Sequence, residues 1–226
     1  MEKKLIYDGT VTKAIVKNEN EHIQKNWMVG RFYETQRNGM LNVIYESEKK
    51  GGKFIDIGAS IGNHTLFFAN VMKGQVIAFE PQFDSYIQLR DNIELNHLTV
   101  TTFNAALGDR KGLVRMKSNS PDNVGMYQVD ESGIGNTVLQ TLDRYEHFVG
   151  GYDVIKIDVE HYNKKLLTGA AEVLTNGRGN VYIEAETPEI LKETDDIMAT
   201  YGYYRIPGLV MNHTPTYLYV KVKPIP

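Results

Sequence analysis

The residues best suited to chemistry stand in a glycine-containing turn, Asp56-Ile57-Gly58-Ala59-Ser60-Ile61-Gly62. The turn joins an apolar strand pattern to an apolar helix pattern. Gly58 can take a turn conformation that a residue with a Cβ resists, and Gly62 lets the start of the helix pack close to the strand. Such a turn opens a space at the carboxyl end of a strand, where open α/β sheets bind ligands. A tight turn without a ligand is the alternative.

The spacing of the glycines separates two kinds of ligand. A dinucleotide needs G-x-G-x-x-G to approach its pyrophosphate, whereas here Ser60 lies between glycines at 58 and 62. The carboxylate of Asp56 would repel a pyrophosphate, but it suits the ammonium group of S-adenosylmethionine, directly or through water. We therefore predict that this turn and the first residue of the helix bind that cofactor, through Asp56, Gly58, Ala59, Ser60, Gly62 and Asn63.

Two further strand ends carry polar or small residues. Glu80 ends the second strand, just before Pro81, and a carboxylate there can accept hydrogen bonds from both ribose hydroxyls. That role is common to NAD and S-adenosylmethionine folds, so it does not discriminate between them. The third strand ends in small residues that leave room for an adenine ring, although an ordinary strand end is an equal alternative. Predicted cofactor contacts are therefore Glu80, Pro81, Asn104, Ala105 and Ala106.

The candidate catalytic residues follow the strand pattern Ile155-Lys156-Ile157. Asp158 and Glu160 share one face of an extended chain, and a buried carboxylate is costly unless it is paired or used. Asp158 could instead cap the next helix, or contact the cofactor. His161 and His64 are further candidate bases, although a histidine near a helix start is most often structural or exposed.

A metal site is a weaker hypothesis. Asp158, Glu160 and Glu184 offer carboxylates of the kind that Mg²⁺ prefers. Nothing in their spacing demands a metal, so we predict no metal ligands.

The elements that position these residues alternate between strand and helix from residue 54 onward, which predicts an α/β fold with a largely parallel sheet. Strands are predicted at 53–58, 75–80, 100–107, 153–159 and 180–185, with helices at 62–73, 84–96, 163–175 and 188–201. Two closing strands at 203–206 and 216–222 are expected to be antiparallel.

We expect one domain over residues 1–226. Residues 1–50 are polar, with a weak helical pattern, and are interpreted as an N-terminal cap on a core of residues 51–226. Residues 109–142 interrupt the alternation as an insert with two short strands, 113–117 and 138–142. Between these strands, the polar segment 119–136 is either a solvated loop or a border of the substrate site.

Composition excludes several classes of function. The chain has no cysteine, which excludes disulfides, thiolate metal sites and a cysteine nucleophile. Its net charge of −3 lacks the basic footprint of a nucleic-acid binder. The first residues show no apolar signal-peptide region, and no apolar run approaches the length of about 20 residues that spans a bilayer. We expect a cytoplasmic protein with no membrane partner.

Taken together, several motifs resemble the FkbM family of methyltransferases. They are Phe54-Ile55-Asp56-Ile57-Gly58-Ala59-Ser60-Ile61-Gly62-Asn63-His64-Thr65, Phe79-Glu80-Pro81, Ala106-Leu107-Gly108-Asp109, Thr141-Leu142-Asp143 and Lys156-Ile157-Asp158-Val159-Glu160, with weaker similarity at Gly30-Arg31-Phe32-Tyr33-Glu34. The resemblance implies a Rossmann-like class I methyltransferase fold and S-adenosylmethionine as methyl donor. Two positions depart from the family pattern: Ser60 replaces the middle glycine of the turn, and His161 stands where the family usually has glycine.

The resemblance further implies O-methylation of a hydroxyl on a sugar, glycan or natural-product-like small molecule. The Asn/Asp-Pro-Pro-Tyr signature of DNA-base methylation is absent from the sequence, so we expect no nucleic-acid partner. An NAD(P)-dependent oxidoreductase and a non-catalytic Rossmann-like binding module are the alternatives. Homo-oligomerisation is left open.

Overall fold

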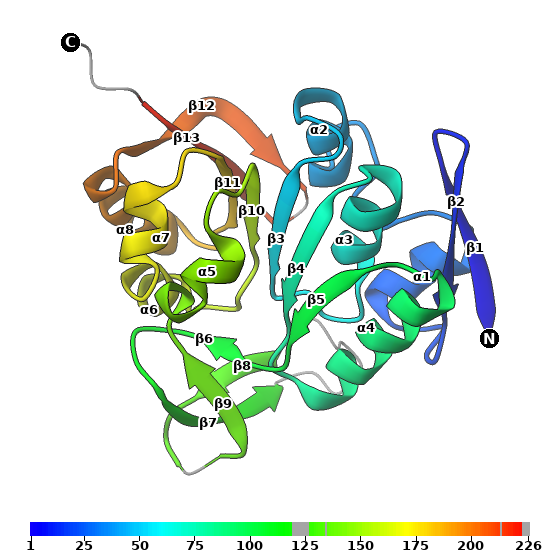
Figure 1. Cartoon of the computed structure of the whole chain (residues 1–226), viewed down its shortest axis with the longest axis horizontal. Coiled ribbons are helices and arrows are strands. Elements are labelled where there is room, and N and C mark those ends of the chain that lie inside the picture. Colours follow the sequence, from blue (N-terminus) through cyan, green and yellow to red (C-terminus); the bar gives the residue numbers. More distant parts are fainter. Residues whose placement is uncertain (119–126, 134, 213, 223–226) are drawn as a thin grey trace.

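The computed structural model describes residues 1–118, 127–133, 135–212 and 214–222. At its centre lies a seven-stranded sheet in the order β12-β13-β11-β10-β3-β4-β5 (Figure 1). The strands in that order are β12 (Tyr203–Met211), β13 (Thr216–Lys221), β11 (Asn180–Glu184), β10 (Val154–Ile157), β3 (Lys53–Ile57), β4 (Gln75–Phe79) and β5 (Val100–Phe103). The pairings among β11, β10, β3, β4 and β5 are parallel, and β13 is antiparallel to both of its neighbours. The predicted α/β sheet with an antiparallel closing strand is confirmed.

Helices cover both faces of this sheet. One face carries α3 (Asn63–Leu66), which runs on into a π-helical turn (Phe67–Val71), and α4 (Phe83–Leu95). The other carries α5 (Glu146–Val149), α6 (Asn163–Thr168), α7 (Ala171–Asn176) and α8 (Pro188–Thr200) (Figure 1). Successive strand residues point to opposite faces, so Phe54 packs into one apolar cluster and Ile55 into the other.

The helix predicted over 163–175 is two helices in the structure. A short 3₁₀ turn (Leu142–Tyr145) brings Asp143 against the second of them. The carboxylate of Asp143 accepts hydrogen bonds from the backbone N–H groups of Glu172 and Val173, at 3.1 and 2.9 Å. These bonds satisfy amides at a new helix start, so the chain begins α7 at this point.

The N-terminal cap, residues 1–50, differs from its expected helical pattern. It begins with an antiparallel hairpin of β1 (Glu2–Tyr7) and β2 (Thr10–Ile15), followed by α1 (His22–Met28) and α2 (Met40–Ser47). Asp8 and Gly9 form the two-residue turn, with φ of 43° and 73°, and an Asp-Gly pair is a strong hairpin signal. Leu5 and Trp27 of the cap share a buried apolar cluster with Phe54 of β3, so the cap and the sheet are packed on one core.

The insert and the short strand just before it form a second sheet, drawn in green at the bottom of Figure 1. Its order is β6-β9-β7-β8, with β6 (Ala106–Leu107), β9 (Thr137–Gln140), β7 (Gly112–Ser118) and β8 (Tyr127–Asp130). The third strand predicted over 100–107 is therefore split, because β5 ends at Phe103 and β6 pairs with β9. The segment 119–136 is not simply a loop, because β8 pairs antiparallel with β7. Residues 119–126 and 134 of that segment lie outside the described residues.

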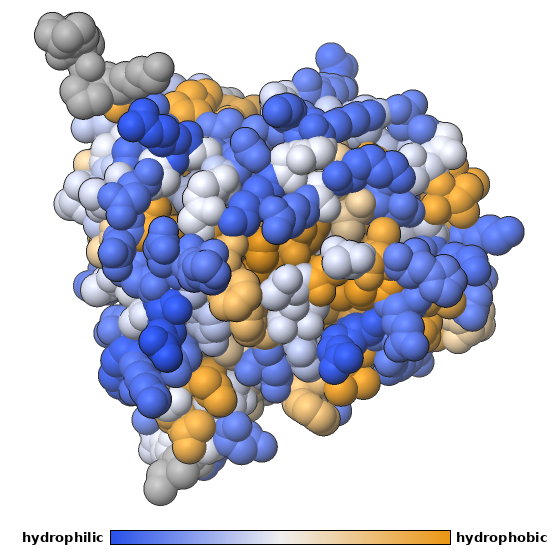
Figure 2. Space-filling model, in the orientation of Figure 1, coloured by the Kyte–Doolittle hydropathy of each residue, from blue (hydrophilic) through white to orange (hydrophobic). Residues whose placement is uncertain are grey.

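Polar and apolar side chains share the molecular surface. The face shown in Figure 2 is mainly hydrophilic, with apolar groups visible between the polar ones. Among the described residues, no helix combines the length and the apolar character needed to cross a bilayer.

Candidate active site

One pocket gathers most of the predicted site residues. Its empty volume is about 840 Å³ when the space that is open to solvent is counted. Residues from the turn after β3, the end of β4, the β5–β6 connection, the insert, the end of β10 and the cap all line it. The predicted residues among them are Gly58, Ala59, Ser60, His64, Glu80, Pro81, Ala105, Ala106, Asp158 and Glu160. The carboxyl ends of β4, β3 and β10 are neighbours in the sheet, which explains why segments so far apart in sequence meet here.

The glycines of the turn are required by packing. Gly58 has a φ of 76°, and a Cβ on it would lie 1.8 Å from the carbonyl oxygen of Asp158. Gly62 has a φ of 101°, and its Cβ would lie 2.8 Å from Leu89 Cδ1 on α4. The close approach expected of Gly62 is therefore made to α4 rather than to the strand. Gly62 is not among the described lining residues, whereas Gly58 is.

Ser60 and Glu80 form the part of the pocket between β3 and β4. The carboxylate of Glu80 accepts hydrogen bonds from the backbone N–H of Ser60 and of Gln82, each at 2.7 Å and each on a different oxygen. Burial raises the pKa of Glu80 to about 7, against the opposing effect of these two bonds. The hydroxyl oxygen of Ser60 is buried and has no hydrogen-bond partner among the described residues.

Asn104 does not face the pocket as expected. Its side-chain amide donates hydrogen bonds to the backbone carbonyls of Glu80 and Pro81, at 2.8 and 3.1 Å. It is not among the described lining residues, unlike Ala105 and Ala106. Asn104 therefore holds the loop after β4 in place, and the two alanines are left to contact a ligand.

Asp56 is also absent from the described lining, because its side chain is fully buried. Its carboxylate accepts a hydrogen bond from Thr65 Oγ1 at 2.6 Å and lies 3.3 Å from the ammonium of Lys156. The expected direct contact between Asp56 and a cofactor ammonium is not available in this arrangement.

Lys156 has a role that the sequence analysis missed. Its ammonium donates to the carbonyl of Gly58 at 2.7 Å and lies 3.4 Å from the carboxylate of Asp158. Burial lowers the pKa of Lys156, but the carboxylates of Asp158 and Asp56 outweigh that effect and raise it. Lys156 thus stays charged and ties the β3 turn to the end of β10. A single lysine within an otherwise apolar strand pattern was the sequence feature that could have indicated this role.

Asn63 and His64 join the site to the N-terminal cap. Asn63 is not among the described lining residues; its side-chain oxygen accepts from Trp27 Nε1 and from the backbone N–H of Tyr33, at 3.1 and 3.0 Å. His64 lines the pocket, and its Nε2 lies 2.8 Å from Glu34 Oε2. In the sequence, Glu34 stood out only as part of the segment Gly30-Arg31-Phe32-Tyr33-Glu34, which is weakly similar to the FkbM pattern.

The end of β10 carries several acidic side chains. Glu160 lies in the pocket, and its pKa is raised to about 7 by burial and by the charges of Asp158 and Glu186. Burial and the nearby Asp158 raise the pKa of Glu184 further, to about 10. Two groups have ligand atoms within 4.8 Å of one another and could hold a cation: Glu160, His161 and Glu186, and Asp158, Glu160 and Glu184.

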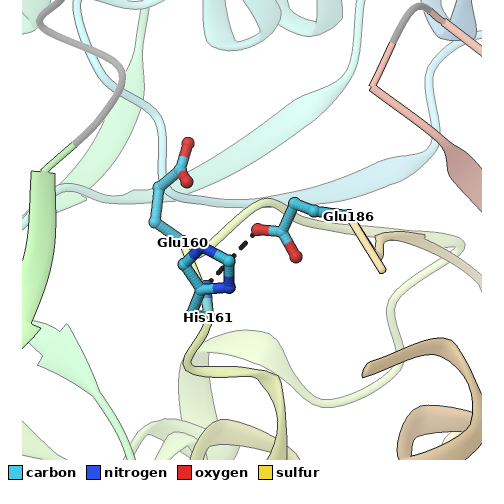
Figure 3. Close-up of side chains that lie close together, drawn as sticks. All are labelled: Glu160, His161 and Glu186. Atoms are coloured by element: carbon cyan, nitrogen blue, oxygen red, sulfur yellow. Dashed lines mark hydrogen bonds between the residues drawn. The ribbon is translucent and has the colours of Figure 1, made fainter. Parts of the chain in front are cut away.

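His161 is exposed and is not among the described lining residues. Its backbone N–H donates to the carboxylate of Glu186 at 3.4 Å, as Figure 3 shows. Its φ is 57°, a left-handed conformation that glycine adopts readily. This conformation gives a physical reason for the glycine that the family usually has there.

Residues 56–204, well over half of the chain, match the family model described as the methyltransferase FkbM domain. The chain belongs to the FkbM methyltransferase family. The predicted family and its cofactor, S-adenosylmethionine, are thereby confirmed, and the oxidoreductase alternative loses its support.

Among curated proteins, the chain is similar to the hexuronic acid methyltransferase AglP of Haloferax volcanii. It is 24% identical over 139 residues, which cover 60% of this chain and 56% of the relative. The chain thus spans little more than half the length of that relative.

Two solved structures support the predicted class I fold. A methyltransferase FkbM from Methylobacillus flagellatus KT has a TM-score of 0.53 and 20% identity, and the match covers 84% of this chain and 48% of that one. A precorrin-6y C5,15-methyltransferase from Geobacter metallireducens GS-15 has a TM-score of 0.52 and 15% identity, covering 85% and 94%. At these identities the similarity concerns the fold alone.

Proposed function

We propose that this FkbM-family chain is an S-adenosylmethionine-dependent O-methyltransferase acting on a hydroxyl of a sugar, glycan or natural-product-like small molecule. The observation that carries the proposal is the position of the carboxylates in one pocket. Glu80 follows β4, Asp158 and Glu160 follow β10, and β3 with its glycine turn lies between them. The pocket therefore has a cofactor side and an acceptor side.

The cofactor side fits S-adenosylmethionine. A carboxylate offers about four lone-pair sites, and two backbone amides use one site on each oxygen of Glu80. One site on each oxygen is left for the two ribose hydroxyls. The orphaned hydroxyl of Ser60 provides a further polar contact, and Ala105 and Ala106 provide an apolar surface for the base. When bound, S-adenosylmethionine supplies an electrophilic methyl group.

The acceptor side suits a molecule rich in hydroxyl groups. Asp158 and Glu160 can accept hydrogen bonds from acceptor hydroxyls and so fix one oxygen in line with the methyl group. Positioning of this kind supplies much of the rate in a displacement reaction. A base takes the hydroxyl proton, and the candidates from the sequence are Asp158, Glu160, His161 and His64. Of these, His161 is the one that does not line the pocket.

The insert supports the proposal that residues 119–136 border the acceptor. Tyr127 and Val129 of β8, with Met116 of β7, line the pocket. These side chains add apolar surface to a pocket that also carries carboxylates, which suits the mixed surface of a sugar or a natural product.

The test is a methyl-transfer assay with neutral hexosides, an amino sugar and a hexuronate as acceptors. We expect S-adenosylhomocysteine to form only with an acceptor present, and mass spectrometry of the product to place the methyl group on oxygen. Asp158→Asn should lower acceptor-dependent turnover at least tenfold while the affinity for S-adenosylhomocysteine stays within about threefold. Methylation of nitrogen alone, or no turnover with any hydroxylated acceptor, contradicts the proposal.

A further inference from the structure

Glu34 has no role in the cofactor and acceptor contacts described above, and its partner His64 appears there only as one of four candidate bases. Both side chains are nearly inaccessible, with 6% of the Glu34 side chain and 7% of the His64 side chain exposed, and Glu34 Oε2 lies 2.8 Å from His64 Nε2. Removing two charged groups from water costs free energy that their mutual attraction need not repay, so packing alone does not account for this pair on the pocket wall.

The chain places Glu34 with several fixed contacts. Its φ of 65° is left-handed, and its carbonyl accepts a hydrogen bond from the backbone N–H of Leu41 at 3.2 Å. The residue before it, Tyr33, is held on both backbone groups by the side-chain amide of Asn63. Since Asn63 directly precedes His64, these bonds hold the cap segment that carries Glu34 against the start of α3, which carries His64.

This arrangement determines which ring nitrogen of His64 is available. The carboxylate of Glu34 accepts from Nε2, so that nitrogen carries the proton in the neutral ring. Nδ1 has no hydrogen-bond partner among the described residues, and His64 lines the pocket. An unprotonated Nδ1 backed by a carboxylate on Nε2 is the arrangement that a histidine base requires.

We propose that His64 is the general base for methyl transfer and that Glu34, on the N-terminal cap, is the residue that positions it. The inference rests on the proposed function. As the acceptor oxygen bonds to the methyl carbon, its O–H bond breaks and the proton passes to Nδ1. The methyl carbon–sulfur bond breaks, its electron pair stays on sulfur, and the positive charge moves from sulfur to the imidazole. Glu34 stabilises the imidazolium that forms.

The neighbouring charged groups favour His64 over Asp158 in this role. Four groups lie near the pair: Lys156 of β10, Asp158 just after that strand, Glu184 of β11 and Tyr33 of the cap. Asp158 forms an ion pair with the buried Lys156. Protonating Asp158 would remove one of the negative charges that stabilise this buried ammonium. Protonating His64 instead creates a new ion pair with Glu34.

The first measurement uses the protein without cofactor, so it does not depend on turnover. ¹⁵N-resolved NMR of the histidine rings should show His64 with its proton on Nε2. Glu34→Gln should weaken that preference and give a mixture of tautomers, because the amide can donate as well as accept. His64→Gln identifies the signal. A wild-type ring with its proton on Nδ1 overturns the proposal.

The second measurement separates chemistry from binding. We expect His64→Gln to lower kcat about a hundredfold or more, the scale of general-base catalysis, while calorimetry shows the affinity for S-adenosylhomocysteine within about threefold. Glu34→Gln should lower kcat about tenfold, and Glu34→Asp should recover part of that loss. His147→Gln changes an exposed histidine on α5 and serves as the matched control with normal kcat.

The outcomes distinguish the two proposals. An unchanged kcat in a folded His64→Gln protein, or a loss confined to cofactor affinity, overturns the role of His64 as base. If wild-type protein methylates no hydroxyl acceptor, the proposed function fails, while the tautomer measurement still decides whether Glu34 sets the protonated nitrogen. Should His64→Gln not fold, as judged by its thermal transition, Glu34→Gln and Glu34→Asp carry the kinetic test.

Discussion

Cofactor affinity should depend on pH through Glu80. The carboxylate is buried, both of its oxygens already accept backbone amides, and its pKa is raised to about 7. Above that pH it is ionised and offers a free lone pair on each oxygen for the ribose. Below that pH one oxygen carries a proton, and the charge-assisted part of both hydrogen bonds is lost.

The size of the effect follows from the pKa. If the ionised form alone binds well, the apparent Kd rises by the factor 1 + 10^(pKa − pH). With a pKa of about 7, binding should weaken about tenfold between pH 8 and pH 6, or roughly 1.4 kcal/mol. Calorimetric titration with S-adenosylhomocysteine across this range measures it directly.

Two variants make the test specific to Glu80. Glu80→Gln should bind about tenfold more weakly at pH 8 and show little pH dependence. Glu160→Gln is the matched control, because the pKa of Glu160 is also raised to about 7 on the acceptor side, and this variant should keep the wild-type profile. A flat profile in the wild type, or an unchanged profile in Glu80→Gln, would refute the reasoning.

The same raised pKa affects stability. The folded protein binds a proton at Glu80 up to about pH 7, whereas the unfolded chain releases it near the ordinary value of 4.5. The free energy of unfolding contributed by this group therefore falls as pH rises from about 4.5 to 7, and it is greatest below that window.

Three further predictions concern packing and the acceptor wall. Gly58→Ala forces a Cβ to within 1.8 Å of a backbone carbonyl oxygen, whereas the Cβ of Gly9→Ala, at a similar φ of 73°, meets nothing within 4 Å. In urea unfolding, Gly9→Ala should lower the free energy of unfolding by about 1 kcal/mol, and Gly58→Ala should lower it clearly more. Equal losses in the two variants would contradict the steric argument. Lys156→Met should lower the free energy of unfolding by about 3–5 kcal/mol, because it leaves a buried carboxylate without its counter-charge. Lys192→Met, at an exposed ion pair, should lower it by less than about 1 kcal/mol. Similar losses in the two variants would show that the buried pair is not coupled. Tyr127→Ala should raise the acceptor KM severalfold and leave S-adenosylhomocysteine affinity unchanged, and a normal KM would remove the insert from the acceptor site.

Local patterns were enough to predict the core of this fold. The apolar strand over 53–58 and the amphipathic pattern over 84–96 reflect which face of each element is buried, and that information lies within a few neighbouring residues. The carboxylates Glu80 and Asp158 could be placed because parallel strands bring their carboxyl ends to one edge of a sheet. The sequence therefore determined the order of elements and the edge on which the pocket lies.

Tertiary contacts decided which polar residues face a ligand and which support the fold. Asp56, Asn63 and Asn104 look like ligand contacts from their positions, but Lys156, the cap and the loop after β4 engage their side chains. Glu34 and His64 are 30 residues apart, and no local pattern relates them. Hydrogen bonds of this kind depend on how separate elements pack, so the sequence determined the candidates and only the folded chain determined their partners.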